Sequence, residues 1–357
     1  MMKIESLLGH LLDVGGSDLH LKVGVPPLVR SQGELVQLEL PRLSADDTLS
    51  IAEELLPPDK FARLHVDGDA EIARSFTGLG RYRINVYIQR RVVGLVFRIV
   101  ASQIPTVEEL SLPPVVQSLA EERRGLILVT GPAGTGKTTT IAAMIGHINR
   151  VRRCHVITLE DPIEVLHKDQ LASIDQREIG VDTPTYQAGL RFSLRQDPDV
   201  LFVGEIRDVE AAEAALNAAE TGHLVISTMH TIDAAETLNR FIDMFEAQRQ
   251  KQVRMTLAGS LRAVICQRLV SRAEGWGRIP AVEIMVVNGR VADLILEPGR
   301  SGDLAVIIQE GGSYGMQTFE QSLLSLVEAG LANPDDASIA ASNQHDFALA
   351  LSKARLG

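Results

Sequence analysis

One short stretch of the sequence, GPAGTGKTTT at residues 131–140, has the residue types and spacing of a phosphate-binding loop. It fits the pattern G-x-x-x-x-G-K-[ST], in which backbone N–H groups cradle phosphates, Lys137 reaches the β- and γ-phosphates, and Thr138 ligates Mg²⁺. An apolar run precedes it and a helix-compatible segment follows, as such a loop requires. A chance match in a glycine-rich turn is the alternative. The predicted nucleotide-binding residues are Gly131, Pro132, Ala133, Gly134, Thr135, Gly136, Lys137, Thr138 and Thr139.

Two glutamates at the ends of apolar runs are candidates for the chemistry at a bound phosphate. Glu160 ends the run in ITLEDPIE, and Glu205 ends VLFVGE, where Gly204 replaces the acidic residue usual in a Walker B strand. In this setting one carboxylate can orient the attacking water, and another can coordinate Mg²⁺ through water. We assign the water to Glu160 and the metal to Glu205 together with Thr138. The reverse assignment of the two glutamates stays open.

Two histidines bracket a third apolar run, GHLVISTMHT at residues 222–231. His230 lies at the carboxyl end of the run, where a γ-phosphate sensor belongs, whereas His223 is as readily a structural residue. Seven residues of extended chain separate them by roughly 23 Å, which argues against a shared metal ion. His230 is therefore the predicted site residue of the pair.

Four arginines could stabilise charge during phosphoryl transfer. Arg191 and Arg195 lie one helical turn apart in GLRFSLRQDPD, while Arg83 and Arg98 lie on separate predicted strands nearer the N-terminus. For each of them the simpler interpretation is solvated surface charge. The other interpretation is an arginine finger, which a second chain can supply.

The apolar pattern that must position these residues changes along the chain. Alternating segments at 17–23, 27–38 and 81–100 predict half-buried strands, and Ser44 opens a helical segment that Pro57 and Pro58 interrupt. Continuous apolar runs from residue 125 predict strands covered on both faces, and hence a mostly parallel α/β sheet with ligands at the carboxyl ends of its strands.

These patterns predict two domains and their connector. Residues 1–100 form a smaller α+β domain, a proline-containing linker spans 101–114, and residues 115–357 form an α/β domain with a helical C-terminal region. Within that region we predict one long helical stretch over 248–270, followed by a strand in RIPAVEIMVV. The weakly patterned segment after residue 331 is expected to be a loosely held tail.

Composition excludes several classes of protein. Lysine and arginine number 35 against 46 acidic residues, so a net charge of −11 gives no overall footprint for nucleic acid. The two cysteines, Cys154 and Cys266, are far apart, which argues against a disulfide framework or a zinc knuckle and suits a reducing cytoplasm. No apolar run approaches the roughly 18 residues of a membrane span, and the start lacks a signal peptide. Membrane association would therefore need a partner.

Several longer stretches together resemble the secretion ATPase superfamily of type IV pili and type II secretion. The likeness is greatest to the PilT-like twitching motility, or pilus retraction, ATPases and covers nearly the whole chain to about residue 330, far more than a lone phosphate loop would. The stretches that carry it, besides that loop, are SDLHLKVGVPPLVR, GRYRINVYIQRR, IPTVEELSLP, ITLEDPIEVLH, LRQDPDVLFVGEIRD, TGHLVISTMHTIDAAETLNRFIDMF and YGMQTFEQSLLSLVEAGL.

The resemblance implies a motor that hydrolyses ATP to power pilus retraction, with Mg²⁺ as cofactor. It implies a PAS-like N-terminal domain, a RecA-like P-loop ATPase domain, and a homohexameric ring with ATP bound between the domains. ITLEDPIE corresponds to the family's Asp box and GHLVISTMH to its His box, and Arg83, Arg98, Arg191 and Arg195 match the arginines that complete the site. The implied location is cytoplasmic and peripheral at the inner membrane. The implied partners are an inner-membrane pilus assembly platform protein and a paralogous pilus ATPase.

Differences within the family leave alternatives for the function. Like retraction-type ATPases, the chain lacks the long N-terminal extension and the four-cysteine zinc motif of extension and secretion ATPases. However, Arg290, Val291, Ala292 and Asp293 follow EIM where the retraction signature Ala-Ile-Arg-Ala-Gly is expected, so the signature arginine is missing. The alternative is an accessory ATPase of the PilU kind with low activity of its own. A nucleic-acid motor is a further alternative, disfavoured by the acidic charge and the 4% aromatic content.

Overall fold

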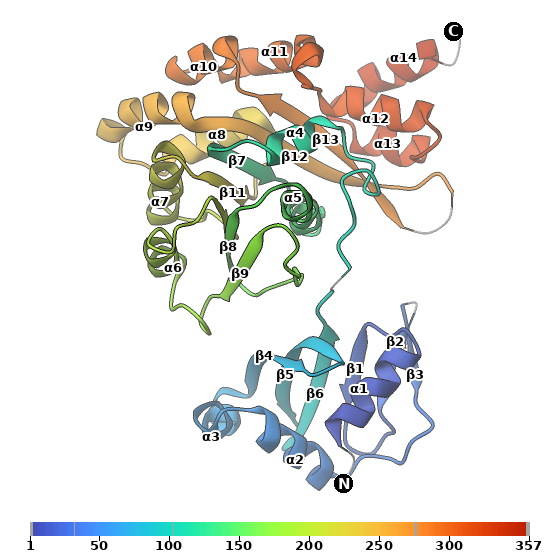
Figure 1. The fold of residues 1–357 in the computed structure, drawn as a ribbon. Coiled ribbons are helices and arrows are strands. Elements are labelled where there is room, and N and C mark those ends of the chain that lie inside the picture. The colour runs from blue at the N-terminus through green and yellow to red at the C-terminus, as the bar shows by residue number, and fades with distance from the viewer. Residues whose placement is uncertain (1–2, 32, 102, 275–276, 355–357) are drawn as a thin grey trace. The chain divides into compact units, whose positions relative to one another are not determined.

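A computed structural model gives the fold and describes residues 3–31, 33–101, 103–274 and 277–354. The chain divides into two units, residues 1–102 and 103–357, each with its own sheet (Figure 1). Each sheet also has an apolar core of its own, which is a defining feature of a separate domain. In the part of the chain that the structure describes, no helix combines the length and the apolar character that crossing a bilayer requires.

The first unit is an antiparallel six-stranded sheet in the order β3-β2-β1-β6-β5-β4. The predicted strands over 81–100 are confirmed as the hairpin β5–β6, and Ser44 caps α2 as predicted. Alternate residues of β5, such as Tyr82 and Ile84, are buried against the helices. The elements are α1 (Ile4–Asp13), β1 (Asp18–Leu21), β2 (Leu28–Ser31), β3 (Glu34–Gln37), α2 (Ala45–Leu55), α3 (Pro58–Asp67), β4 (Asp69–Phe76), β5 (Gly80–Gln89) and β6 (Val92–Ile99).

The second unit is built on a seven-stranded sheet in the order β13-β12-β7-β11-β10-β8-β9, in which only the β12–β13 pair is antiparallel. The predicted parallel α/β sheet is thus confirmed. The strands are β7 (Gly125–Thr130), β8 (His155–Glu160), β9 (Ser173–Glu178), β10 (Val200–Val203), β11 (Leu224–Met229), β12 (Leu261–Ser271) and β13 (Arg278–Val286).

Helices cover both faces of this sheet, which explains the continuous apolar runs. Leu126 and Leu128 of β7 belong to one core and Ile127 and Val129 to the other, because successive side chains of a strand point to opposite faces. Figure 1 shows α5 on the opposite side of β8 from α6 and α7. The helices are α4 (Val115–Ala120), α5 (Lys137–Val151), α6 (Tyr186–Ser193), α7 (Val209–Glu220), α8 (Ala234–Asp243), α9 (Ala247–Ser260), α10 (Gly289–Leu296), α11 (Leu304–Glu310), α12 (Phe319–Glu328), α13 (Pro334–Ala340) and α14 (Gln344–Ala354), with 3-10 turns at Ser301–Asp303 and Gly311–Tyr314.

The long helix predicted over 248–270 is wrong in its second half. Helix α9 ends at Ser260, and β12 begins at Leu261 and pairs with both β7 and β13. The segment LRAVICQRLV contains a run of apolar residues whose spacing suits a buried strand as well as a helix. Pairing with two neighbours in the sheet decides for the strand. The strand predicted in RIPAVEIMVV is confirmed as β13.

The expectation of a loosely held tail after residue 331 is also wrong. Helices α13 and α14 pack against β12 and α12, and the Phe347 side chain is only 1% exposed. Ala337 and Ala341 are buried in the same cluster, which includes Val270 of β12 and Leu323 of α12. Small alanines allow the close packing of these helices but give little apolar periodicity in the sequence.

Candidate functional site

The predicted phosphate loop lies between β7 and α5 at the carboxyl end of the parallel sheet. Gly131 and Gly136 have φ angles of 142° and 86°, a region that favours glycine, so the loop can turn sharply from strand to helix. The Lys137 amine donates hydrogen bonds to the carbonyl oxygens of Gly131 at 2.7 Å and Pro132 at 3.0 Å. Burial lowers the pKa of Lys137, and the carboxylates of Glu205 and Glu164 act in the opposite direction.

A residue that the sequence analysis did not select, Gln267 of β12, braces this loop. Its Nε2 donates to the Thr135 carbonyl at 2.7 Å, and its Oε1 accepts from the Thr140 hydroxyl at 2.8 Å. A Cβ on residue 131 would lie 2.5 Å from the Gln267 carbonyl oxygen, so the strand and the loop approach too closely for a side chain there. Gln267 was missed because its segment was assigned to a helix.

Two hollows of the second unit meet at the loop. The first, which we call the central cavity, has a volume of about 250 Å³; the second, the loop hollow, measures about 580 Å³. Both are lined by Gly134, Lys137, Thr138 and Glu164. The rest of the central cavity is formed by Ala133, Glu160, Asp161, Pro162, Tyr186, Phe202, Gly204, Glu205, Arg207, Thr228 and His230. The rest of the loop hollow is formed by Leu110, Gly136, Thr139, Thr140, Gln267, Leu269, Gly277, Arg278 and Pro280.

Glu160, the last residue of β8, lies at the buried wall of the central cavity and is 6% exposed. Its Oε1 accepts hydrogen bonds from the Thr158 hydroxyl at 2.6 Å and from Gln176 Nε2 at 3.1 Å. Burial raises the pKa of Glu160 above its ordinary value, although both hydrogen bonds act to lower it. A raised pKa brings a carboxylate closer to the range in which it can accept a proton near neutral pH.

Glu205 is held in its charged form. Arg207 Nη2 lies 2.8 Å from Glu205 Oε2, and His230 Nε2 lies 3.2 Å from Oε1. Burial alone would raise the pKa of Glu205, but the hydrogen bond from Arg207 and the charges of His230 and Arg207 outweigh it, so the pKa is lowered. The two glutamates therefore differ in the way that a proton acceptor and a cation ligand should differ.

The residues of the central cavity that sequence reasoning missed include Glu164, Tyr186 and Arg207. Glu164 is exposed and lines both hollows, so its carboxylate can reach a water molecule more freely than the buried Glu160. Its place in DPIE, four residues after Glu160, was a usable signal. Tyr186 and Arg207 gave no such signal, because only the three-dimensional fold shows that their side chains reach the cavity.

The two histidines have different surroundings. His230 is exposed at the carboxyl end of β11 and contacts Glu205, in the position predicted for a phosphate sensor. His223 lies before the amino end of the same strand, with Nδ1 3.0 Å from the Ala218 carbonyl and 3.3 Å from the Thr221 hydroxyl. Those contacts account for His223 as a structural residue.

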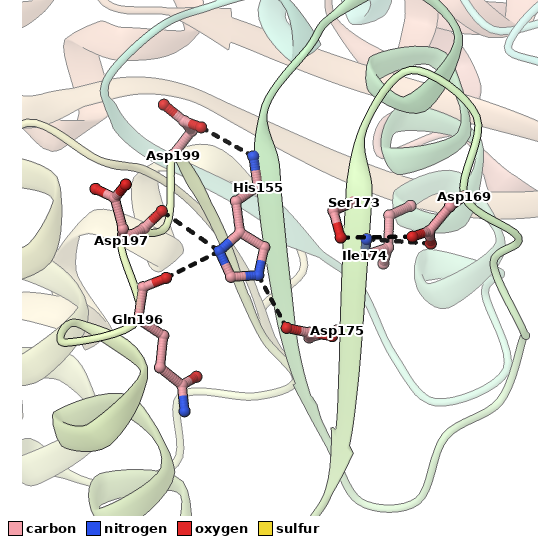
Figure 2. Close-up of polar contacts among 8 residues, drawn as sticks. All are labelled: His155, Asp169, Ser173, Ile174, Asp175, Gln196, Asp197 and Asp199. Carbon is pink, nitrogen blue, oxygen red and sulfur yellow. Dashed lines mark hydrogen bonds and ion pairs between the residues drawn. The ribbon is translucent and has the colours of Figure 1, made fainter.

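Arg191 and Arg195 do not line the central cavity or the loop hollow of their own chain. Helix α6 begins at the central cavity with Tyr186 and ends at Ser193. The residues after it lie at the amino end of β8, opposite the carboxyl ends of the strands that form the cavity. There the His155 ring, at the amino end of β8, contacts the carbonyl of Gln196 directly after Arg195 (Figure 2). The two arginines were predicted to lie one helical turn apart, but only Arg191 lies on the helix, and Arg195 follows its end.

His155 fixes the segment that follows Arg195, as Figure 2 shows. Its Nδ1 lies 3.0 Å from the Gln196 carbonyl and 3.3 Å from that of Asp197, while its Nε2 lies 3.0 Å from Asp175 Oδ2. Its backbone N–H donates to Asp199 at 2.9 Å. Because both ring nitrogens face acceptors, only the protonated imidazole can donate from both.

In the first unit, Arg83 and Arg98 are direct partners across the β5–β6 pair. Both therefore lie on one face of that sheet. Arg98 Nε donates to Asp18 Oδ1 at 2.7 Å, and Arg83 Nε lies 3.8 Å from Glu71 Oε1. Each arginine thus has a carboxylate partner of its own within the unit.

The residues predicted to hold Mg²⁺ fit such an ion. The Thr138 hydroxyl and the Glu205 carboxylate both line the central cavity, and Mg²⁺ prefers oxygen ligands of these kinds. The carboxylate is kept charged by Arg207 and His230, and Lys137 lies beside it.

Comparisons with known proteins agree with this arrangement. The family model described as type II/IV secretion system protein matches residues 24–278. The type IV pilus retraction ATPase PilT of Pseudomonas aeruginosa is 39% identical over 94% of this chain and 97% of its own, and the type IV pilus ATPase PilU of that organism is 38% identical over 98% and 91%. A crystal structure of the pilus retraction motor PilT with bound ADP is 40% identical, with a TM-score of 0.87 over 97% of this chain and 99% of its own. The predicted resemblance and fold class are confirmed.

Proposed function

Because the chain belongs to the type II/IV secretion system protein family, we propose that it is an ATP hydrolase that powers the retraction of type IV pili. The observation that carries this proposal is the similarity over 97% of the chain to a pilus retraction motor whose structure contains ADP, joined to a phosphate loop at the edge of a cavity lined by carboxylates. The 39% identity to a pilus retraction ATPase supports the same function.

The nucleotide would bind across the two hollows. Backbone N–H groups of the phosphate loop and the Lys137 amine would hold the phosphates, with the terminal phosphate in the central cavity. The loop hollow offers the apolar side chains of Leu110, Leu269 and Pro280 to a nucleoside. An ATP molecule thus finds charged groups at one end and apolar contacts at the other.

Hydrolysis needs a water molecule placed in line with the terminal phosphate. We assign this task to Glu160, whose raised pKa suits a proton acceptor, with Glu164 as the second candidate because it is more exposed to the cavity. Thr138 and Glu205 would hold Mg²⁺, which when bound neutralises charge on the phosphate oxygens. His230 would contact the phosphate and report its presence to Glu205.

The arginines extend the proposal to the assembly. Arg191 and Arg195 lie away from the cavity of their own chain, which suits a role at a neighbouring subunit. Arg83 and Arg98 of the first unit stay predicted as further arginines that assist hydrolysis. We propose a homohexameric ring that acts in the cytoplasm on an inner-membrane pilus assembly platform protein.

An accessory role of the PilU kind is the second candidate function. The 38% identity to a PilU ATPase over 98% of the chain supports it, although the PilT relative is as similar. Arg290, which stands where the retraction signature begins, lies on α10 and pairs with Glu310 at 3.0 Å. The two candidates differ in the turnover expected of the isolated protein.

Steady-state ATPase activity and the mass in solution test the proposed function. The wild-type protein should hydrolyse ATP as a hexamer and require Mg²⁺, and Lys137→Ala should abolish turnover while remaining folded. A folded hexamer without turnover would favour the accessory function. Stimulation of turnover by DNA would instead point to a nucleic-acid motor, and normal turnover in Lys137→Ala would contradict the assignment of the site.

A further inference from the structure

Tyr186, the first residue of α6, occupies the space that a side chain at residue 204 would need. A Cβ on residue 204 would lie 2.7 Å from the Tyr186 hydroxyl oxygen and 3.3 Å from Cε1 of the ring. The first distance is shorter than non-bonded carbon and oxygen atoms can approach. A side chain at residue 204, where a Walker B strand usually has an acidic residue, would therefore require Tyr186 to shift.

The backbone of Gly204 is held firmly against this ring. Its N–H donates to the Leu159 carbonyl at 2.8 Å, and its carbonyl accepts from the Thr228 hydroxyl at 2.7 Å. These bonds connect residue 204 to the ends of both neighbouring strands, β8 and β11. Residue 204 therefore cannot move aside at low cost.

The hydroxyl lies in the wall between two hollows. Tyr186 lines the central cavity and a neighbouring hollow of about 440 Å³, and the two share Asp161, Glu205 and Arg207. Burial and the negative charge of Asp161 raise the pKa of Tyr186, so the hydroxyl stays protonated at neutral pH. Among the described residues it has no hydrogen-bond acceptor, although Thr158, Thr228 and other hydroxyls nearby do.

We propose that the Tyr186 hydroxyl is a further ligand of the nucleotide and donates a hydrogen bond to an oxygen of the terminal phosphate. This inference rests on the proposed binding and hydrolysis of ATP at the phosphate loop. A protonated phenol is a donor to anionic oxygen, and it stands at the cavity wall beside Glu205, at the place from which the usual acidic side chain is missing. Its loss should therefore be felt by ATP and not by ADP.

Binding of two nucleotides to wild type and Tyr186→Phe tests the proposal. Phenylalanine keeps the ring and removes only the hydroxyl. Affinity for a non-hydrolysable ATP analogue should fall about tenfold, whereas affinity for ADP should stay unchanged, because the lost bond goes to a charged oxygen of the terminal phosphate. Equal effects on both nucleotides, or none, would overturn it.

A matched control and turnover measurements complete this experiment. Tyr314→Phe removes an exposed tyrosine hydroxyl from the same unit and should change neither affinity. If the wild type hydrolyses ATP and Tyr186→Phe loses the analogue selectively, both proposals stand. If the wild type binds neither nucleotide, the proposed function fails and the inference that rests on it fails too. Nucleotide binding that is unaffected by Tyr186→Phe contradicts only the inference.

A second set of variants tests the contact independently of nucleotide. Gly204→Ala should lower the melting temperature of the otherwise wild-type protein, because its Cβ meets the hydroxyl at 2.7 Å. The same change should cost less in Tyr186→Phe, where the nearest neighbours become the Leu159 carbonyl at 3.1 Å and Cε1 at 3.3 Å. Additive effects of the two substitutions would show that the hydroxyl is not above residue 204.

Discussion

Arg207 binds Glu205 on the side away from His230, so the carboxylate stands between two positively polarised groups. Arg207 Nη2 lies 2.8 Å from Oε2, while His230 Nε2 lies 3.2 Å from Oε1. Arg207 is only two positions after Glu205 in the sequence, yet its guanidinium turns back onto the glutamate at the central cavity, which both residues line. This pair fixes both the charge and the orientation of the carboxylate proposed to hold the metal ion.

Replacing Arg207 should therefore weaken the metal site. In Arg207→Ala the pKa of Glu205 should rise, because the hydrogen bond and the charge that lower it are lost while burial remains. Because the arginine is 66% exposed, we expect a severalfold fall in turnover at neutral pH and not its abolition. The fall should grow as the pH is lowered and shrink at high Mg²⁺ concentration.

Arg207→Lys is the control for this prediction, since it keeps the charge and loses the planar donor group. It should fall between wild type and Arg207→Ala in turnover. An Mg²⁺ requirement and pH profile identical to the wild type in Arg207→Ala would show that Glu205 does not depend on this partner.

The two candidates for activating water can be separated by isosteric substitution. Glu160→Gln should lower the turnover number by about a hundredfold or more, because the amide cannot accept the proton, while nucleotide affinity stays near that of the wild type. Glu164→Gln should have a smaller effect. Single-turnover hydrolysis measures the chemical step directly. The reverse order of the two effects would assign the water to Glu164.

His155 should make the stability of the second unit depend on pH. Burial acts to lower the pKa of His155, but the hydrogen bonds to Asp175 and to the carbonyls of Asp197 and Gln196 outweigh it, so the pKa is raised above 6.5. The stabilisation is therefore fully present below about pH 6.5 and is lost as the pH rises through the higher folded-state pKa.

Thermal unfolding of wild type and His155→Gln over this range of pH measures the contribution. The melting temperatures should differ most at about pH 6 and converge as the pH rises above the folded-state pKa. Asp175 is 64% exposed, so the difference should also shrink with added salt. A constant difference at all pH values would mean that the imidazole acts through packing alone.

The C-terminal helices should contribute to the stability of the second unit. Phe347→Ala removes a side chain that is 1% exposed and should cost about 3 to 5 kcal/mol of unfolding free energy. Leu349→Ala, on the same helix but 49% exposed, is the matched control and should cost far less. Equal midpoints in chemical denaturation for the two variants would show that this segment does not contribute to the stability of the second unit.

The sequence predicted those parts of the molecule that depend on local pattern. The phosphate loop, the buried strands and the placement of Glu160, Glu205 and His230 at strand ends follow from spacing and from the rule that ligands lie at the carboxyl ends of parallel strands. These residues meet because their strands are neighbours in one sheet. The order of the strands was not predicted, because apolar runs indicate buried strands but not which strands are neighbours.

The remaining features depend on contacts between distant segments. Gln267 reaches the phosphate loop only because β12 lies beside β7, and an apolar run that suits helix or strand equally concealed that strand. Tyr186 reaches Gly204 from another element, and no spacing rule connects the two. Buried alanines and Phe347 similarly hold the last helices without a periodic signal.

The first residue of helix α6 lies in the wall of the central cavity, and its last residue, Ser193, directly precedes the segment that His155 holds at the amino end of β8. Its eight residues span about 12 Å, and a hydrogen-bonded helix of that length neither stretches nor bends appreciably. Because Tyr186 and Arg191 belong to this one short helix, any rigid shift of the helix would move the cavity wall and Arg191 together. The helix thus connects the cavity to the segment after Arg195, which His155 holds by hydrogen bonds to its carbonyl oxygens.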